Sequence, residues 1–286
     1  MSGERAALLL GEAGMQRLGE ALVLVVGTGG VGSWVVEVLT RAGVGRLRLV
    51  DPDAVSLTDR NRQLPALNST AGLPKVEVLA DRCRDISGSV QVEAVVGRFD
   101  VDSLEALLGG PPDAVVDCID RVSDKVLLLQ TCVERGIPVF SAMGAGGRMD
   151  PTRVRLGALN HTRVDPLARV VRDALRERGV SADIPCVWSD EDPHGLHGDD
   201  LYGETGHLLV QGSVSWIPSL FGVKLGGLVV NRLLGQAVWG MDSEVGRHQE
   251  RSGRTQQRTS PSVKPSRAHK AALLAQAGFA RGPRED

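Results

Sequence analysis

Residues 23–33 have the sequence VLVVGTGGVGS, in which an apolar run is joined to the start of a helix by a GxGxxG pattern. Glycines allow the tight turn and the close approach of a phosphate to the backbone, and the N–H groups at the helix start favour its negative charge. Asp51 closes the next apolar run. The stretch predicts a nucleotide-binding βαβ unit, and it fits NAD or FAD as well as ATP.

The first half of the chain alternates between apolar β-branched runs and helical patterns. Such alternation predicts an α/β fold with a doubly wound, mainly parallel sheet, and ligands at the carboxyl ends of its strands. Gly27, Asp51 and Asp120 fall at such ends. The predicted strands are Leu22–Val26, Leu47–Val50, Val90–Val96, Ala114–Cys118 and Pro138–Ser141, and the predicted helices are Gly32–Ala42, Pro74–Asp85, Val122–Arg135 and Val170–Gly179.

Two cations, Arg62 and Lys75, follow the second strand and the acids Asp51 and Asp53. A dinucleotide pyrophosphate held at a helix N-terminus needs little further positive charge, whereas a reacting triphosphate needs Arg and Lys where charge develops. The pattern favours ATP over a nicotinamide cofactor, and thus an ATP-using enzyme over an oxidoreductase. The structural alternative is that the acids end a strand and the cations are ordinary surface residues.

With these motifs the sequence resembles the ubiquitin-activating-like adenylating enzymes, which include the bacterial activators of sulfur-carrier proteins. The resemblance runs from about Arg5 to Gly240. It implies catalytic roles for Arg5, Arg62, Lys75 and Asp120, with Asp120 also associated with Mg²⁺. It implies a homodimer, because the family's equivalent of Arg5 reaches into the partner subunit's site. The nucleotide-binding residues it implies are Gly27, Gly29, Gly30, Gly32, Asp51, Asp53, Asn61, Arg62, Gln63, Lys75 and Asp120.

One position departs from the family pattern: Asp59 stands where the family usually has asparagine. A carboxylate close to a triphosphate is repulsive unless a cation intervenes. Two interpretations remain from the sequence, one in which Asp59 turns outward and one in which it helps to hold magnesium. A third, a catalytically silent ATP-binding scaffold, also follows from this substitution.

The order of motifs in the second half resembles the tRNA threonylcarbamoyladenosine dehydratase branch of the family. The resemblance implies ATP-dependent ring closure of threonylcarbamoyladenosine in tRNA through an acyl-adenylate, with release of AMP and pyrophosphate. The alternative is activation of the C-terminus of a small sulfur-carrier protein. Whether a monovalent cation or a sulfur-transfer partner takes part stays open. The motifs are residues 144–152, 162–169, 187–191 and 212–218.

Three features of this half have two interpretations each. The glycines at 144, 146 and 147 offer backbone amides to an anion or form a tight turn between strands. The tryptophans at 188 and 216 stack on a base or fill the core. An excess of arginines forms a patch for RNA phosphates or a solvated helix face; they are Arg148, Arg153, Arg155, Arg163, Arg169, Arg172, Arg176 and Arg178.

Composition sets further limits. In 286 residues, 42% hydrophobic content is enough for one sizeable core, and a net charge of −2 argues against a generally basic nucleic-acid binder. The four cysteines form no CxxC pair, so we expect buried reduced thiols and no zinc. We expect a cytoplasmic protein without a membrane span. The predicted domains are an adenylating domain over 1–241, with the ATP site mostly in 5–125 and the substrate side in 140–240, and a mobile basic tail over 242–286.

Overall fold

The computed structural model describes residues 4–194 and 212–236, which all lie in one compact unit of the chain. Their strands form one seven-stranded sheet in the order β3-β2-β1-β4-β5-β7-β6. Every neighbouring pair is parallel except β6 with β7. This confirms the doubly wound, mainly parallel sheet. The strands are β1 (Leu22–Val26), β2 (Arg46–Asp51), β3 (Gln91–Val96), β4 (Ala114–Asp117), β5 (Val139–Ala142), β6 (Val154–Ala158) and β7 (Pro185–Ser189).

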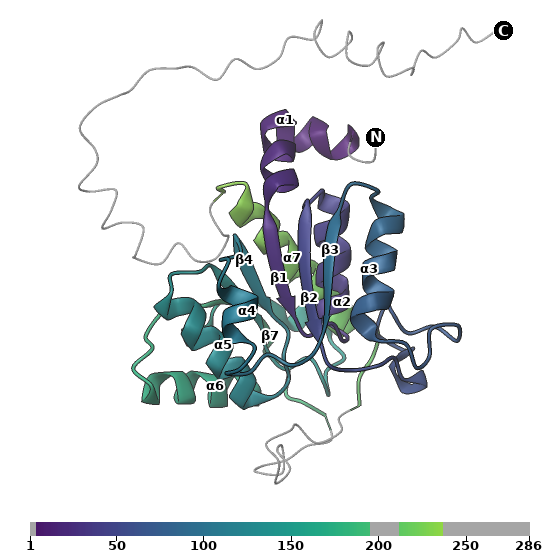
Figure 1. Ribbon diagram of the computed structural model, residues 1–286. Coiled ribbons are helices and arrows are strands. Elements are labelled where there is room, and N and C mark those ends of the chain that lie inside the picture. The colour runs from purple at the N-terminus through teal and green to yellow at the C-terminus, as the bar shows by residue number, and fades with distance from the viewer. Residues whose placement is uncertain (1–3, 195–211, 237–286) are drawn as a thin grey trace, which may run out of the picture. The chain divides into compact units, whose positions relative to one another are not determined.

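Helices cover both faces of the sheet (Figure 1). The helices α2, α3 and α7 lie on one face, and α4, α5 and α6 lie on the other. The helices are α1 (Glu4–Glu20), α2 (Gly32–Ala42), α3 (Lys75–Ile86), α4 (Leu104–Leu108), α5 (Val122–Glu134), α6 (Pro166–Glu177) and α7 (Trp216–Leu233), with short 3₁₀ helices η1 (Leu57–Asp59), η2 (Pro151–Arg153) and η3 (Leu159–His161). In these described segments, none of the helices is long and apolar enough to cross a bilayer.

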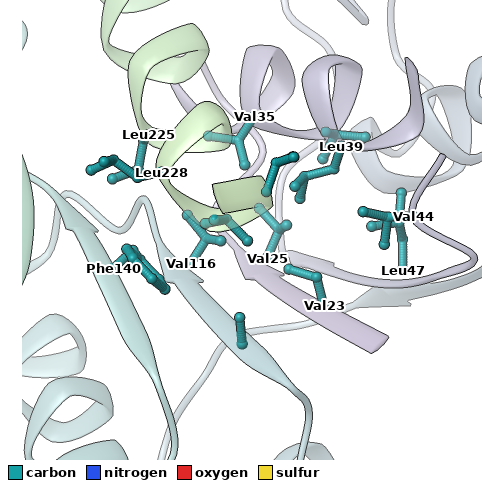
Figure 2. Close-up of a cluster of buried hydrophobic side chains, with 14 of the residues drawn as sticks. Val23, Val25, Val35, Leu39, Val44, Leu47, Val116, Phe140, Leu225 and Leu228 are labelled. Atoms are coloured by element: carbon teal, nitrogen blue, oxygen red, sulfur yellow. The ribbon is translucent and has the colours of Figure 1, made fainter. Parts of the chain in front are cut away.

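The central strand β1 shows why the sequence reads as a continuous apolar run. Successive side chains of a strand point to opposite faces, and here both faces are covered by helices. Val23 and Val25 pack toward α2 and α7, in the cluster drawn in Figure 2 with Leu39 and Leu225. Leu24 and Val26 join the second cluster, under α4, α5 and α6. The two clusters hold the carboxyl ends of the strands at one edge, where the predicted ligand site lies.

The predicted strands and helices, with one exception, begin and end within two residues of their expected ends. The exception is α6, which begins at Pro166 rather than at Val170. Asp165 caps it, since its carboxylate accepts a 3.0 Å hydrogen bond from the Ala168 amide, and Pro166 suits the first helical position. The sequence analysis also missed α1, α4, β6 and β7. The proposed boundary after residue 241 and the tail beyond it lie outside the described residues.

Candidate active site

A cavity of about 590 Å³ opens at the carboxyl ends of β1, β2, β4 and β5. Its lining combines residues far apart in the sequence, as expected for the edge of a parallel sheet where strand order reverses. Gly32, Asn61 and Arg5 are not among the lining residues. The predicted residues that do line it are Gly27, Gly29, Gly30, Asp51, Asp53, Arg62, Gln63, Lys75 and Asp120.

The glycine loop needs its glycines for two separate reasons. Gly27 has φ +87°, and a Cβ there would lie 2.6 Å from the carbonyl oxygen of Cys118. A Cβ on Gly32 would lie 1.8 Å from the carbonyl oxygen of Gly27. These two glycines allow close packing of backbone on backbone. Gly29 and Gly30, like Gly27, line the cavity, so the loop presents bare backbone at the start of α2, a cradle that suits a phosphate.

Asp51, the acid expected to hold ribose hydroxyls, also fixes the glycine loop. Its carboxylate accepts hydrogen bonds from the Thr28 amide (2.6 Å) and hydroxyl (3.0 Å), and from the Asp53 amide (2.9 Å). The side chain is buried but lines the cavity. The loop geometry therefore depends on this acid whether or not a ligand is bound.

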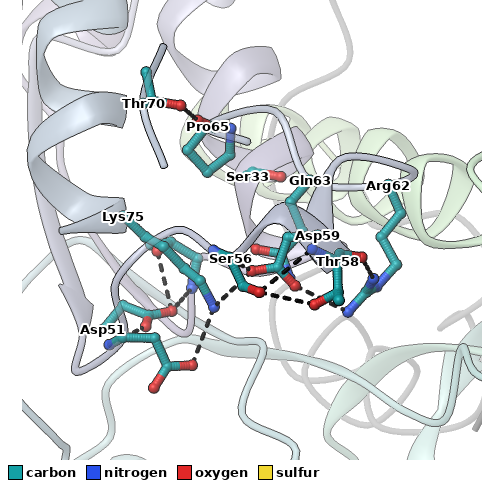
Figure 3. A network of polar contacts seen from close by, with 12 residues as sticks. Ser33, Asp51, Ser56, Thr58, Asp59, Arg62, Gln63, Pro65, Thr70 and Lys75 are labelled. Carbon is teal, nitrogen blue, oxygen red and sulfur yellow. Dashed lines mark hydrogen bonds and ion pairs between the residues drawn. The ribbon is translucent and has the colours of Figure 1, made fainter. Parts of the chain in front are cut away.

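Asp59 lies at the centre of the polar network shown in Figure 3. It is 7% exposed, so the interpretation in which it turns outward is wrong. The reason is local: Ser56 and Asp59 form a capping box around η1, which turns the carboxylate inward. That carboxylate accepts 2.8 Å from Gln63 Nε2 and lies 3.3 Å from Arg62 Nη2 and 3.7 Å from Lys75 Nζ.

The two expected phosphate-binding cations are thus held by acids of the same cavity. Lys75 begins α3, is almost fully buried, and places its ammonium 3.0 Å from Asp53. Arg62 is more exposed, and its guanidinium also donates to the Thr58 carbonyl (3.2 Å) and to the Asn61 side chain (2.9 Å). The negative charges of Asp53 and Asp59 therefore offset the positive charges of Lys75 and Arg62. Asp59 also lines the cavity, so its charge is offset there by the two cations with which it is paired.

Neither Asn61 nor Arg5 lines the cavity, although Asn61 contacts residues that do. The Asn61 side-chain amide donates a 2.8 Å hydrogen bond to the carbonyl of Ser213, at the start of the last described segment. Because Ser213 lines the cavity, Asn61 fixes part of the cavity lining in this structure. Arg5 is an exposed residue of α1, which lies beyond the end of the sheet where β1 begins (Figure 1). It therefore forms no part of its own chain's cavity.

Asp120 stands in the loop after β4 with its side chain exposed to the cavity. Its carboxylate accepts no hydrogen bond from the described residues. Three further charged residues line the cavity: Asp124, in the first turn of α5, and the arginines at 98 and 121. The sequence analysis missed all three. In the part of the chain that the structure describes, no three His, Cys, Asp or Glu side chains gather as a metal cluster.

The glycine-rich loop of the second half is anchored as a tight turn. The Gly144 amide donates 3.0 Å to Asp165, and the Gly147 amide donates 2.8 Å to the Gly212 carbonyl, so neither is open to an anion. Gly146, the third predicted glycine, lines the cavity. Arg148 is buried with its guanidinium 3.4 Å from Asp165. Burial raises the pKa of the Asp165 carboxyl, against the opposing effect of Arg148. Residues 143–146 of this loop form one wall of the cavity.

The arginine excess is mostly paired. Arg153 and Arg155 both bind Asp190, Arg172 donates to the Thr162 hydroxyl, and Arg176 binds Asp173. Only Arg163 and Arg169 of the predicted patch are exposed and without a partner among the described residues. Of the two tryptophans, Trp188 is in the core, while Trp216 is 46% exposed and donates 2.8 Å to the Met149 carbonyl. The patch is therefore narrower than the sequence predicts.

Glu191 holds the end of the same loop at residues 149 and 150, a contact that the sequence did not reveal. Its carboxylate accepts from the amides of Met149 (3.0 Å) and Asp150 (2.8 Å). Burial alone raises its pKa, but these amides and His194 outweigh burial and lower the pKa below the usual 4.5. The resulting stability is present above pH 4.5 and is lost as pH falls through the lowered pKa.

Glu191→Gln is accordingly expected to lower the free energy of unfolding by about 2 kcal/mol at pH 7. The difference from the wild type should shrink as pH falls from about 6 to 3, because the wild-type carboxylate becomes protonated while glutamine does not titrate. Urea unfolding of both proteins at several pH values measures this difference in the free energy of unfolding. A difference that is independent of pH would show that the charge of Glu191 contributes nothing.

The cysteines are all free. Burial raises the pKa of Cys118, Cys186 and Cys83, and raises that of Cys132 to about 12. The thiols are therefore protonated at neutral pH and are poor nucleophiles. Cys83, Cys132 and Cys186 are buried, as expected, whereas Cys118 is half-buried and lines the cavity.

Fold and cavity together define a class: doubly wound α/β proteins in which a glycine loop and two cations face one cavity, the arrangement of a nucleotide-binding site. The chain belongs to the ThiF family, whose family model matches residues 3–188. This confirms the resemblance on which the sequence analysis relied.

Similarity to one branch extends along most of the chain. A Bacillus subtilis protein named tRNA threonylcarbamoyladenosine dehydratase is 37% identical over 238 residues, which is 80% of this chain and 93% of that protein. The crystal structure of the Escherichia coli tRNA N6-threonylcarbamoyladenosine dehydratase TcdA in complex with ATP matches with a TM-score of 0.73 at 32% identity, over 81% of this chain and 93% of that one. By contrast, a Salmonella typhimurium molybdopterin-synthase adenylyltransferase is 38% identical over 48% of this chain and 54% of its own length.

Proposed function

We propose that this chain is an ATP-dependent dehydratase that closes the threonylcarbamoyl group of a modified adenosine in tRNA to a ring. The observation that carries the proposal is the joining of the glycine cradle with Arg62 and Lys75 in one cavity. Its support comes from the dehydratases of Bacillus subtilis and Escherichia coli, which this chain matches over most of its length. A tRNA substrate also implies a cytoplasmic location.

The chemistry follows from the need for a leaving group. A carboxylate oxygen of the threonyl group bonds to the α-phosphorus of ATP, and the bond from that phosphorus to pyrophosphate breaks. The ureido nitrogen then attacks the activated carbonyl carbon, loses its proton, and AMP leaves with the former carboxylate oxygen. The second step is intramolecular, so it has a high effective molarity. The protein contributes mainly electrostatic stabilisation in the first step.

The chain's own residues divide this work. Backbone of Gly29 and Gly30 faces the phosphates, and Lys75 and Arg62 offset the charge that develops on the leaving oxygens. The Asp120 carboxylate is exposed to the cavity and unpaired with the described residues, and such hard oxygens suit Mg²⁺, which is commonly held by one or two carboxylates and by substrate phosphates. We assign Mg²⁺ to Asp120 on this ground. When bound, the ion would supply further positive charge at the phosphates.

A homodimer is part of the proposal, with Arg5 acting in the partner subunit's cavity. Its support is the position of Arg5 on α1, outside its own cavity, beside Leu8 and Leu9, which are 78% and 87% exposed. Exposed leucines next to each other are typical of a surface that is covered by another chain. Light scattering is expected to give twice the monomer mass, and a monomer that is fully active would contradict this assignment.

The test is mass spectrometry of nucleosides after incubation of threonylcarbamoyl-tRNA with the protein, ATP and Mg²⁺. We expect loss of one water from the modified nucleoside, matched by AMP. With oxygen-18 in the threonyl carboxylate, one labelled oxygen should appear in AMP. AMP release with a small sulfur-carrier protein, and an unchanged nucleoside, would instead establish the alternative activity. Omission of monovalent salts or sulfur-transfer proteins from the reaction tests whether either is needed.

A further inference from the structure

A fully buried polar cluster lies next to the cavity without lining it. Lys125, Asp117 and Ser141 have no exposed surface. The Lys125 ammonium lies 2.6 Å from Asp117 Oδ2 and 3.4 Å from Ser141 Oγ, and the Ser141 hydroxyl donates 2.5 Å to the same carboxylate oxygen. The three residues come from α5, the end of β4 and β5. None of them is a lining residue of the cavity.

Stability does not explain this cluster. Desolvation of two charges offsets their mutual attraction, and apolar residues of similar volume commonly serve as well or better. The surroundings are apolar, with Val126, Leu128 and Leu129 on the same helix all buried. A buried ion pair retained in such surroundings is better explained by the backbone that it holds in place.

The cluster closes the loop that presents Asp120. Asp117 ends β4, and Lys125 lies in the first turns of α5. Of the seven residues between them, the first four, Cys118 to Arg121, all line the cavity. Asp117 Oδ1 also accepts 3.1 Å from the Ile119 amide, and the Lys125 amide donates 3.0 Å to the Arg121 carbonyl. Both ends of this loop are therefore tied to the same buried pair.

We infer that Lys125, through its ion pair with Asp117, is a positioning residue that sets the place of Asp120 at the cavity. The inference rests on the proposed function only in that Asp120 acts in the reaction. The loop also contacts the glycine cradle, since a Cβ at Gly27 would lie 2.6 Å from the Cys118 carbonyl. A shift of the loop by a fraction of an ångström would therefore displace Asp120 relative to the phosphates.

The double variant Asp117→Asn, Lys125→Met removes both charges and keeps an acceptor for the Ile119 amide. We expect it to fold, with kcat of the tRNA reaction about 100-fold lower because misplacement of a reacting group is costly. KM for ATP should change by less than about threefold, since Lys75 and Arg62 still bind the phosphates in the ground state. If KM for ATP instead rose about 100-fold while kcat stayed at the wild-type value, the inference would be overturned.

A coupling test separates positioning from general loss of structure. In an Asp120→Asn background, the double variant should cause little further loss of kcat, because it acts through a carboxylate that is already gone. If the two losses multiply, Lys125 does not act through Asp120 and the inference fails. A matched control removes an ion pair between α2 and α3 with Glu37→Gln, Arg82→Met, for which kcat should stay at the wild-type value.

Hydrogen exchange supplies a readout that does not depend on turnover. Amides of residues 119–121 should exchange faster in the double variant, and unchanged protection would contradict the inference. If the wild type leaves the nucleoside unaltered, the proposed function fails, and hydrogen exchange still decides whether the pair holds the loop. Should the double variant not fold, Ser141→Ala removes one hydrogen bond from Asp117 and should show a smaller loss with the same coupling to Asp120→Asn.

Discussion

Asp120→Ala is expected to lower kcat for ATP-dependent conversion of the tRNA nucleoside by about 100-fold or more, because it removes the carboxylate assigned to Mg²⁺ at the phosphates. The fold should be retained. Asp120 is exposed and makes no hydrogen bond to the described residues, so the free energy of unfolding should change by less than about 0.5 kcal/mol. Rates of AMP release over a Mg²⁺ titration, with thermal unfolding of the same samples, measure both.

Asp102→Ala is the matched control for Asp120→Ala. Asp102 is an exposed acid outside the cavity, so the change in net charge is the same while the site is untouched. Its rate should equal that of the wild type. A wild-type rate for Asp120→Ala itself would remove this residue from the reaction and would leave the Mg²⁺ assignment without support.

Lys75→Ala is expected to lower kcat/KM for ATP by about 10²–10³-fold, because a positioned cation is lost where charge develops on the leaving oxygens. Both parameters should change: KM rises as ground-state contact with the phosphates is lost, and kcat falls as the transition state loses charge stabilisation. Steady-state rates over a range of ATP concentrations measure this, and direct ATP binding by calorimetry separates the two effects.

Arg60→Ala is the control for Lys75→Ala. Arg60 is an exposed cation near η1 that bonds to the Leu57 carbonyl and to Asn68, and it does not line the cavity. It should leave kcat/KM within about twofold of the wild type, as expected for a surface change away from the site. If Lys75→Ala behaves in the same way, the ammonium does not contact the phosphates.

The sequence predicted the backbone of the site better than its side-chain directions. Glycine spacing and strand ends are local properties, so the cradle and the places of Asp51, Lys75 and Asp120 followed from them. The direction of the Asp59 side chain was not predicted. The spacing of Ser56 and Asp59 is that of a capping box, and it would have indicated an inward carboxylate. The departure from the family's usual asparagine at this position said less about the side-chain direction than the local capping-box pattern does.

Long-range pairings were the part that could not be predicted. Lys125 lies three residues after Val122 and four before Leu129, on the apolar face of its helix, which was a signal of burial. Its partner Ser141 comes from another strand, and Glu191 reaches amides about forty residues earlier in the chain. Such contacts depend on the strand order β4-β5-β7, which no local pattern specifies. The arginine patch was overestimated for the same reason, because Asp190 and Asp165 neutralise cations distant in sequence.

The pairing of Lys75 and Arg62 with Asp53 and Asp59 means that the resting site already holds its own counterions. A triphosphate must compete with these carboxylates for the cations, and only a ligand with several negative charges competes well. AMP, which lacks the two terminal phosphates, is expected to compete less well than ATP with these carboxylates for Lys75 and Arg62.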